Sequence, residues 1–299
     1  MNNNSLFYYF VCNVGSESFL KEEIKKFYPE LVFSFSKKGM VTFKASKKIN
    51  INNVVFCLFA GEFVKKGSKD IILSHTENII ELDEFYFPIK PISLEPGKVY
   101  YEMFAINEKE HYLGKFIANE NQRYLKEELP LKSPSRAYLK IVEAVSKLNL
   151  KLHEDDVALE IGSSPGGATY ALLLKGLEVI GVDPGEMHPE CLNFKKFKHF
   201  KKSIQDFDVK CLDGKKIDWL LVDMNLAPEA SLNEIEKIFN YIKKDFKGAF
   251  ITLKMTKISL VSKLPFYFKI IQRMNLNPKL MTQLPSHKQE FLLFVESAR

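Results

Sequence analysis

The sequence predicts an α/β protein whose larger, C-terminal part is a mostly parallel sheet with helices on both faces. Three observations lead to this prediction. From Ser133 onward, short apolar runs alternate with helical patterns, as in successive β-α units. One run enters a glycine-rich turn, which is typical of a ligand-binding strand–loop–helix unit. The last two runs are joined by a loop too short for a crossover, so they must pair antiparallel.

The strands of this C-terminal part follow from short, mostly apolar runs, since a parallel strand is buried on both faces. The expected parallel strands are Val157–Ile161, Glu178–Val182, Trp219–Asp223 and Ala249–Leu253. Helices are expected from Ser133 to about Leu150 and at Thr169–Lys175, Leu232–Phe246 and Ile258–Met274. The closing antiparallel pair is expected at Lys279–Leu284 and Glu290–Glu296.

Residues 1–95 are expected to form a smaller α/β domain. A strand at Phe7–Asn13 precedes a helix that Ser16 can cap, and a hairpin turns at Lys37-Lys38-Gly39. Prolines at 88, 91 and 96 suit a linker, and alternating residues then predict a second hairpin. The expected domains are therefore 1–95, a linker and hairpin at 96–132, and 133–299.

Composition narrows the class of protein. The 299 residues carry a formal net charge of +6, which mildly favours an anionic partner such as RNA. The four cysteines lack metal-type spacing, so we expect no metal site and buried thiols in a reducing compartment. No run reads as a signal peptide or a membrane span, and we expect a cytoplasmic protein that is a monomer or homodimer.

The glycine-rich turn is the strongest single motif. Its residues are Gly162, Ser163, Ser164, Pro165, Gly166 and Gly167. The spacing does not fit the dinucleotide fingerprint or the P-loop, but it resembles a loop that binds S-adenosylmethionine (SAM). Its backbone is expected to face the methionine part of SAM. Asp183, which ends the second strand, is expected to bind the ribose hydroxyls, and Asp223 is expected to contact the cofactor as well. Asp206 is either an adenine-binding carboxylate or a simple loop residue.

Four charged residues are expected to converge beside this loop, because ligands of an open α/β sheet bind at the carboxyl ends of its strands. Asp223 and Lys254 end parallel strands, and Glu290 begins the final strand, which runs the other way. Lys140 lies in the preceding helix. Taken singly, Lys140 reads as an exposed helix lysine, Asp223 as a cap and Glu290 as a strand-edge charge. Four of them together favour a site.

Lys140, Asp223, Lys254 and Glu290 match the Lys-Asp-Lys-Glu tetrad of the FtsJ-like ribose 2′-O-methyltransferases. The chain most resembles their M-type group, which modifies a cytidine of 23S ribosomal RNA. Ser133–Lys140, Gly181–Met187 and Trp219–Met224 also match, and the match covers residues 133–299 in order. The opening, Phe10–Glu17, is similar to the family's THUMP-associated region, and Ala168 stands where an aromatic residue is usual.

The resemblance implies a Rossmann-like methyltransferase sheet with an antiparallel last strand, SAM as cofactor, and ribosomal RNA or a precursor particle as partner. A ribose hydroxyl needs orientation and a base, so we assign Lys254 as base and Lys140 to position the hydroxyl, with Asp223 and Glu290 orienting both lysines. The alternatives are a tRNA or mRNA-cap substrate, a non-catalytic RNA-binding protein, or an NAD-binding protein. The expected RNA contacts are Arg123, Arg136, Lys288, Lys37 and Lys38.

Overall fold

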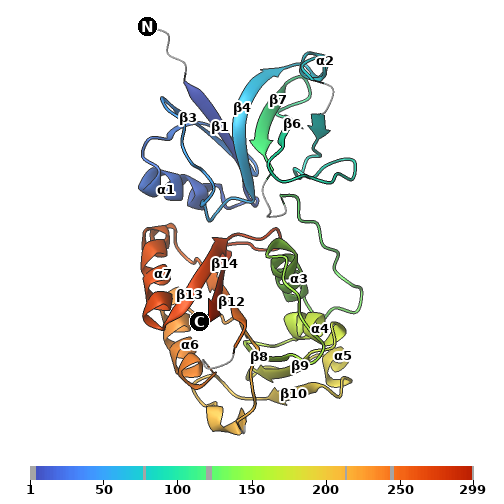
Figure 1. Ribbon diagram of the computed structural model, residues 1–299, viewed down its shortest axis with the longest axis vertical. Helices are drawn as coiled ribbons and strands as arrows, with labels where there is room; N and C mark the ends of the chain where they lie inside the picture. The colour runs from blue at the N-terminus through green and yellow to red at the C-terminus, as the bar shows by residue number, and fades with distance from the viewer. Residues whose placement is uncertain (1–4, 77–78, 119–122, 213, 243–245, 298–299) are drawn as a thin grey trace. The chain divides into compact units, whose positions relative to one another are not determined.

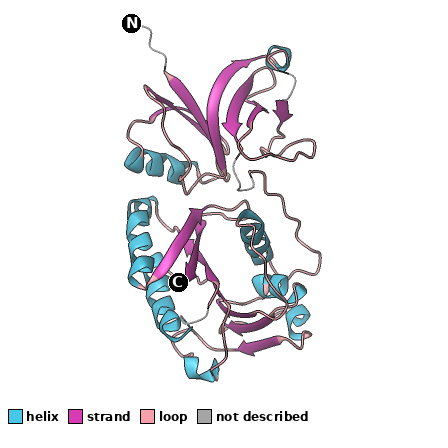
Figure 2. Cartoon of the chain, viewed as in Figure 1, coloured by secondary structure: helices cyan, strands magenta, loops and turns pink. Residues whose placement is uncertain are grey.

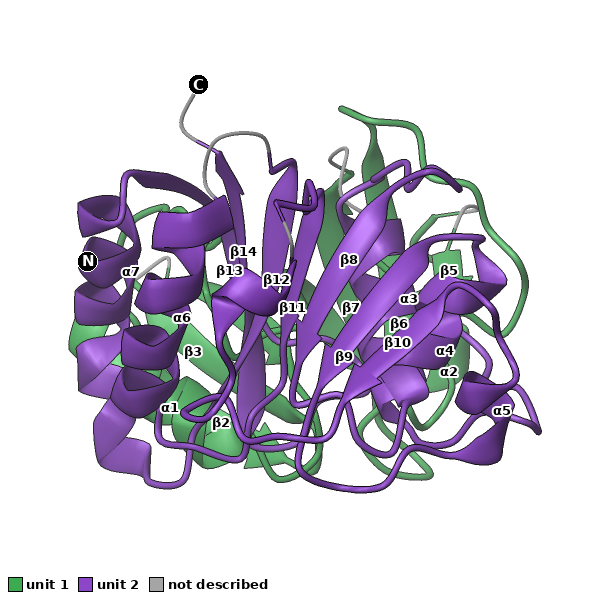
Figure 3. Ribbon diagram, turned by 90° about the horizontal axis from the view of Figure 1, so that it is seen from below, with its two compact units in different colours: residues 1–126 green, residues 127–299 purple. Residues whose placement is uncertain are grey.

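The computed structural model describes residues 5–76, 79–118, 123–212, 214–242 and 246–297. The chain divides into two compact units, Met1–Lys126 (unit 1) and Glu127–Arg299 (unit 2), which Figure 3 draws in different colours. Each unit is built on its own seven-stranded sheet.

The sheet of unit 2 has the strand order β10-β9-β8-β11-β12-β14-β13. The strands are β8 (Val157–Ile161), β9 (Glu178–Val182), β10 (Phe197–Phe200), β11 (Trp219–Val222), β12 (Gly248–Lys254), β13 (Leu276–Thr282) and β14 (Glu290–Ser297). β14 pairs antiparallel with both β12 and β13, and the other pairs are parallel. A mostly parallel sheet closed by an antiparallel strand is thereby confirmed, although the edge strand β10 was not expected.

Helices cover both faces of this sheet, as Figures 1 and 2 show. One face carries α3 (Ala137–Lys147), α4 (Gly167–Leu174) and the short α5 (Pro189–Leu192). The other carries α6 (Pro228–Ile242), η2 (Ile258–Lys263) and α7 (Leu264–Arg273), and a further turn, η1 (Val209–Leu212), precedes β11.

The core of unit 2 places α3 against the sheet. Ile141 and Ala144 of α3 belong to one buried cluster with Leu172 of α4 and with Trp219 and Phe250 of the strands. Burying each large apolar side chain contributes about 1.5–3 kcal/mol. This packing holds α3 across the face of the strands that end at the candidate site.

The sheet of unit 1 has the order β2-β3-β1-β4-β7-β6-β5. Its strands are β1 (Leu6–Val11), β2 (Val32–Lys37), β3 (Met40–Ala45), β4 (Phe59–Gly67), β5 (Ile79–Glu81), β6 (Val99–Ala105) and β7 (His111–Ile117). Its helices are α1 (Glu17–Phe27) and α2 (Lys69–Leu73).

The structure divides the chain at a different place from the sequence-based boundary at residue 95. The hairpin β6–β7, assigned from sequence to a linker region, continues the sheet of unit 1 because β7 pairs with β4. The proline-containing stretch before it is mostly exposed, with a bridge between Leu82 and Pro88. The prolines therefore lie in a loop within unit 1 and not in a linker between domains, and unit 1 extends to Lys126.

Candidate active site

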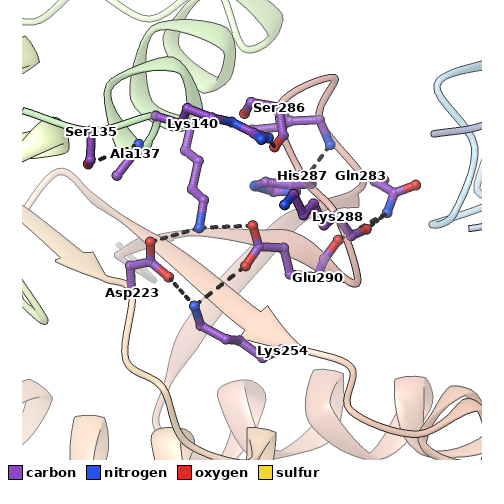
Figure 4. A network of polar contacts seen from close by, with 12 residues as sticks. Ser135, Ala137, Lys140, Asp223, Lys254, Gln283, Ser286, His287, Lys288 and Glu290 are labelled. Carbon is purple, nitrogen blue, oxygen red and sulfur yellow. Dashed lines mark hydrogen bonds and ion pairs between the residues drawn. The ribbon is translucent and has the colours of Figure 1, made fainter. Parts of the chain in front are cut away.

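Three of the four tetrad residues are placed by strand ends. Asp223 directly follows β11, and its backbone N–H donates to Ile161 O at the end of β8. Lys254 ends β12 and is the register partner of Glu290, the first residue of β14. Because β14 runs opposite to β12, its beginning lies at the carboxyl edge. The fourth residue, Lys140, reaches this edge from α3 (Figure 4).

The four side chains form a closed ring of alternating charge (Figure 4). Lys140 Nζ lies 2.8 Å from Asp223 Oδ2 and 2.9 Å from Glu290 Oε1. Lys254 Nζ lies 3.3 Å from Asp223 Oδ1 and 3.7 Å from Glu290 Oε2. The side chain of Lys140 is 15% exposed and that of Lys254 is 28% exposed. Each lysine Nζ therefore contacts both carboxylates, and the contacts of Lys254 are the longer ones.

The electrostatics of the ring separate the roles of its members. Burial lowers the pKa of Lys140, but the charges and hydrogen bonds of Asp223 and Glu290 outweigh burial and raise it. Lys140 is thus a firmly protonated donor at neutral pH. Beside it, burial and then the Lys140 charge lower the pKa of His287 to about 3, so this imidazole is neutral. His287 Nδ1 accepts from Leu284 N at 3.2 Å, which assigns the ring proton to Nε2.

The glycine-rich loop passes directly against the turn that carries Asp223. Gly162 has φ +84°, and a Cβ added there would lie 2.5 Å from Asp223 O, so this position requires glycine. Ser163 Oγ lies 3.6 Å from Met187 Sδ, and Ser164 Oγ donates to Glu186 O at 2.8 Å. Pro165 O accepts from His188 N at 2.9 Å. Gly166 is the N-cap of α4 and Gly167 its first residue.

Asp183 and Asp206 lie where the sequence places them, the first directly after β9 and the second in a loop after β10. Asp183 is half-buried, and its Oδ1 accepts from Gly185 N at 2.6 Å. Asp206 is exposed, and its Oδ2 accepts from Ser203 Oγ at 2.6 Å. The Asp206 contact fits a loop carboxylate, so the two interpretations of this residue stay open.

One acidic group beneath the loop was missed from sequence. Glu160 of β8 is buried, and its Oε2 accepts from Thr169 Oγ1 at 2.5 Å. Burial raises the pKa of Glu160 to about 8, with further contributions from the charges of Asp223 and Asp183, while the bond from Thr169 lowers it. A carboxylate inside an otherwise apolar strand, three positions before Ser163, was the signal available.

The structure corrects one expected RNA contact. Arg123 forms an ion pair with the fully buried Glu102 at 2.7 Å, and its guanidinium centre lies 3.7 Å from the Phe116 ring centroid and 4.5 Å from that of Phe59. The side chain is only 11% exposed. Arg123 therefore belongs to the core of unit 1 and is not available to a phosphate.

The other expected contacts differ in how exposed they are. Lys38 and Lys288 are exposed. Arg136 is exposed too, but its Nη2 donates to Ser286 O at 2.9 Å. Lys37 is half-buried and its Nζ donates to Ala105 O at 2.7 Å, so it is engaged within unit 1.

Comparison with known proteins now adds to this geometry. The family model described as FtsJ-like methyltransferase matches residues 134–292, more than half of the chain. The chain belongs to the FtsJ-like methyltransferase family. The matched region contains all four residues of the ring and the glycine-rich loop.

Curated relatives within this family are named ribosomal RNA large subunit methyltransferase M. The protein from Psychromonas ingrahamii is 29% identical over 143 residues, 44% of this chain and 38% of its own length. That from Pasteurella multocida is 32% identical over 131 residues, 42% of this chain and 33% of its own length. The chain thus matches well under half of the length of these relatives. A solved structure, Aeropyrum pernix fibrillarin with natively bound SAM, has a TM-score of 0.41 at 13% identity, covering 68% of this chain and 84% of that one.

Membrane spans and metal ligands were the other features considered from the sequence. Among the described residues, no helix is both long and apolar enough to span a bilayer. In the same part of the chain, no three His, Cys, Asp or Glu side chains gather as metal ligands would. Of the cysteines, Cys12, Cys57 and Cys191 are buried.

Proposed function

We propose that this protein is a SAM-dependent methyltransferase that modifies the 2′-hydroxyl of a ribose, a cytidine of 23S ribosomal RNA, in the cytoplasm. The observation that carries the proposal is the closed Lys140–Asp223–Lys254–Glu290 ring, with both lysines in contact with both carboxylates. It lies beside a glycine-rich loop in a chain of the FtsJ-like family.

The residues around the loop fit SAM. The Gly162–Gly167 backbone allows a ligand to approach closely, and Asp183 offers a half-buried carboxylate at the end of the next strand for ribose hydroxyls. Asp206 is our candidate for the adenine amine. SAM supplies a methyl group already activated by its sulfonium charge, so the protein must orient the RNA hydroxyl and remove its proton.

The two lysines divide this work. Lys140 stays protonated, since its carboxylate contacts are the shorter pair, and it donates to the hydroxyl oxygen to hold it in line. Lys254 has the longer contacts, 3.3 and 3.7 Å, and the more exposed side chain. It is therefore the better placed amine to accept the hydroxyl proton. Asp223 and Glu290 keep both amines at the carboxyl edge.

The substrate assignment rests on the curated relatives, whose name specifies ribosomal RNA of the large subunit. Exposed basic residues bordering the ring, Arg136 and Lys288, would contact the backbone of naked RNA or of a precursor particle. Unit 1, with Lys38 exposed on its hairpin, would add to RNA binding. The protein would act as a monomer or homodimer. Another RNA, such as tRNA or an mRNA cap, is the second candidate substrate.

Two measurements test the proposal. Calorimetry of the full chain should show binding of SAM and none of NAD. Mass spectrometry of nucleosides from 23S RNA should show one 2′-O-methylcytidine lost in a deletion strain and restored by the wild-type gene. A chain that binds no SAM would refute the enzyme assignment. Loss of a methyl group from tRNA alone would refute the substrate.

A further inference from the structure

Arg136, the N-cap of α3, and two residues of the helix contact a single segment of the chain. Arg136, Lys140 and Glu143 are four and three positions apart, which places them along one side of the helix. Arg136 Nη2 donates to Ser286 O at 2.9 Å, and Lys140 pairs with Glu290. Glu143 Oε2 accepts twice from Ser286, from the backbone N at 3.0 Å and from Oγ at 2.7 Å.

The contact between α3 and Ser286 affects the geometry of the ring, because Lys140 is the one ring residue that does not stand at the end of a strand. Asp223 and Lys254 stand at the ends of adjacent strands, and Lys254 is the register partner of Glu290. Lys140 is carried by a helix, so its position relative to the strand ends depends on side-chain contacts. Among these, the Glu143–Ser286 pair gives α3 two hydrogen bonds to the loop that leads into Glu290.

The loop is fixed by internal contacts, so the position of Ser286 affects the position of Glu290. Gln283 Nε2 donates to Lys288 O at 2.7 Å, which closes the loop across its base. Ser286 and Glu143 are both buried. Figure 4 shows Ser286 and His287 in this loop, which leads down to Glu290 at the start of β14. A shift of Ser286 against α3 would therefore change the Lys140–Glu290 distance.

We propose that Glu143 is a positioning residue: by accepting both donors of Ser286 it fixes α3 to the loop before β14 and so places Lys140 in the ring. The proposal rests on the proposed function for its consequence on catalysis. The placement of Lys140 by Glu143 does not depend on any reaction.

The kinetic test compares Glu143→Ala with Glu143→Gln. The Gln side chain keeps an oxygen that can accept from Ser286, so its kcat should stay near the wild-type value. The Ala variant loses the acceptor, and misplacing the hydroxyl donor should lower kcat on the order of 10–100-fold with the KM for SAM unchanged. Ser286→Ala keeps the backbone donor and should fall between them, which provides a milder variant if Glu143→Ala folds poorly.

A matched control separates positioning from general stability. Asp156 is also a buried carboxylate of unit 2, accepts from Trp219 Nε1 at 2.8 Å and from His153 N at 3.1 Å, and lies at the opposite edge of the sheet, just before β8. Asp156→Asn should lower the melting temperature and leave kcat unchanged. If Asp156→Asn lowers kcat as much as Glu143→Ala, or if Glu143→Gln is as impaired as Glu143→Ala, the proposal is overturned.

Competitive acetylation of the full chain, without RNA or SAM, gives the second readout. In Glu143→Ala, the labelling rate of Lys140 should rise several-fold relative to the surface residue Lys263, and in Glu143→Gln it should not. Unchanged labelling of Lys140 in Glu143→Ala would overturn the proposal even if methylation occurs. A wild-type protein that methylates no RNA would refute the proposed function, and the labelling would still decide the positioning.

Discussion

Replacing Lys140 by Met removes the more tightly held cation of the ring and keeps a side chain of similar length. Lys140 Nζ lies 2.8 Å from Asp223 and 2.9 Å from Glu290. At an effective dielectric constant of about 20, each contact corresponds to about 6 kcal/mol of Coulomb attraction, most of which is offset by the hydration that the three groups lose. Removing one partner of a fully buried pair costs about 3–5 kcal/mol.

The expected loss is smaller here. The carboxylates are 21% and 11% exposed and keep Lys254 as a partner, so we expect about 2 kcal/mol and a fall in melting temperature of about 4–8 °C. Calorimetric unfolding of the wild type and the variant measures both the free-energy loss and the fall in melting temperature. Lys263→Met is the matched control. The side chain of Lys263 is 49% exposed and its Nζ lies 2.5 Å from Glu229 Oε1. Loss of this surface pair should change the free energy of unfolding by less than about 0.5 kcal/mol. Equal effects of the two variants would refute the view that the ring is a tightly coupled charge cluster.

Three further outcomes are expected. Asp183→Ala should weaken SAM binding in a calorimetric titration while far-UV circular dichroism stays unchanged, and equal affinity would remove Asp183 from the cofactor site. Lys38→Glu should weaken RNA binding and lower the slope of log affinity against log salt by about one, and an unchanged slope would exclude a phosphate contact. Burial raises the pKa of Glu160 from 4.5 to about 8. Its contribution to the free energy of unfolding is therefore fully present below pH 4.5 and is lost as the pH rises through 8. Glu160→Gln should therefore flatten the fall of unfolding free energy over this window, by at most about 1.4 kcal/mol per pH unit, in denaturant titrations.

The parts of the fold that could be predicted are those with a strong local signal. β8 and β9 begin and end at the expected residues because a strand buried on both faces is mostly apolar along its length, here with only Glu160 and Glu178 as charged residues. The direction of β14 followed from the short loop before it. β10 was missed because it is a four-residue edge strand with only half-buried aromatic residues and an exposed lysine, which gives no periodic pattern.

The parts that could not be predicted depend on contacts between distant residues. Arg123 reads as a surface cation until Glu102 and the aromatic rings of unit 1 are seen around it. The ring of four charged residues could be predicted, because three of them stand at strand ends and all four match the family's tetrad. The bonds from Ser286 to Glu143 were not, since the two residues are 143 positions apart and neither stands in a motif.

The base assignment is tested most directly by single-turnover methylation with saturating RNA and SAM across a pH series, comparing wild type, Lys254→Ala and Lys254→Arg. The account predicts that both variants bind SAM and RNA but transfer no methyl group, since a guanidinium stays protonated and cannot accept the hydroxyl proton. The wild-type rate should rise with pH, because the reaction removes a proton from the ribose hydroxyl. Near-wild-type turnover by Lys254→Arg would contradict the account, because it would show that a permanently protonated side chain suffices.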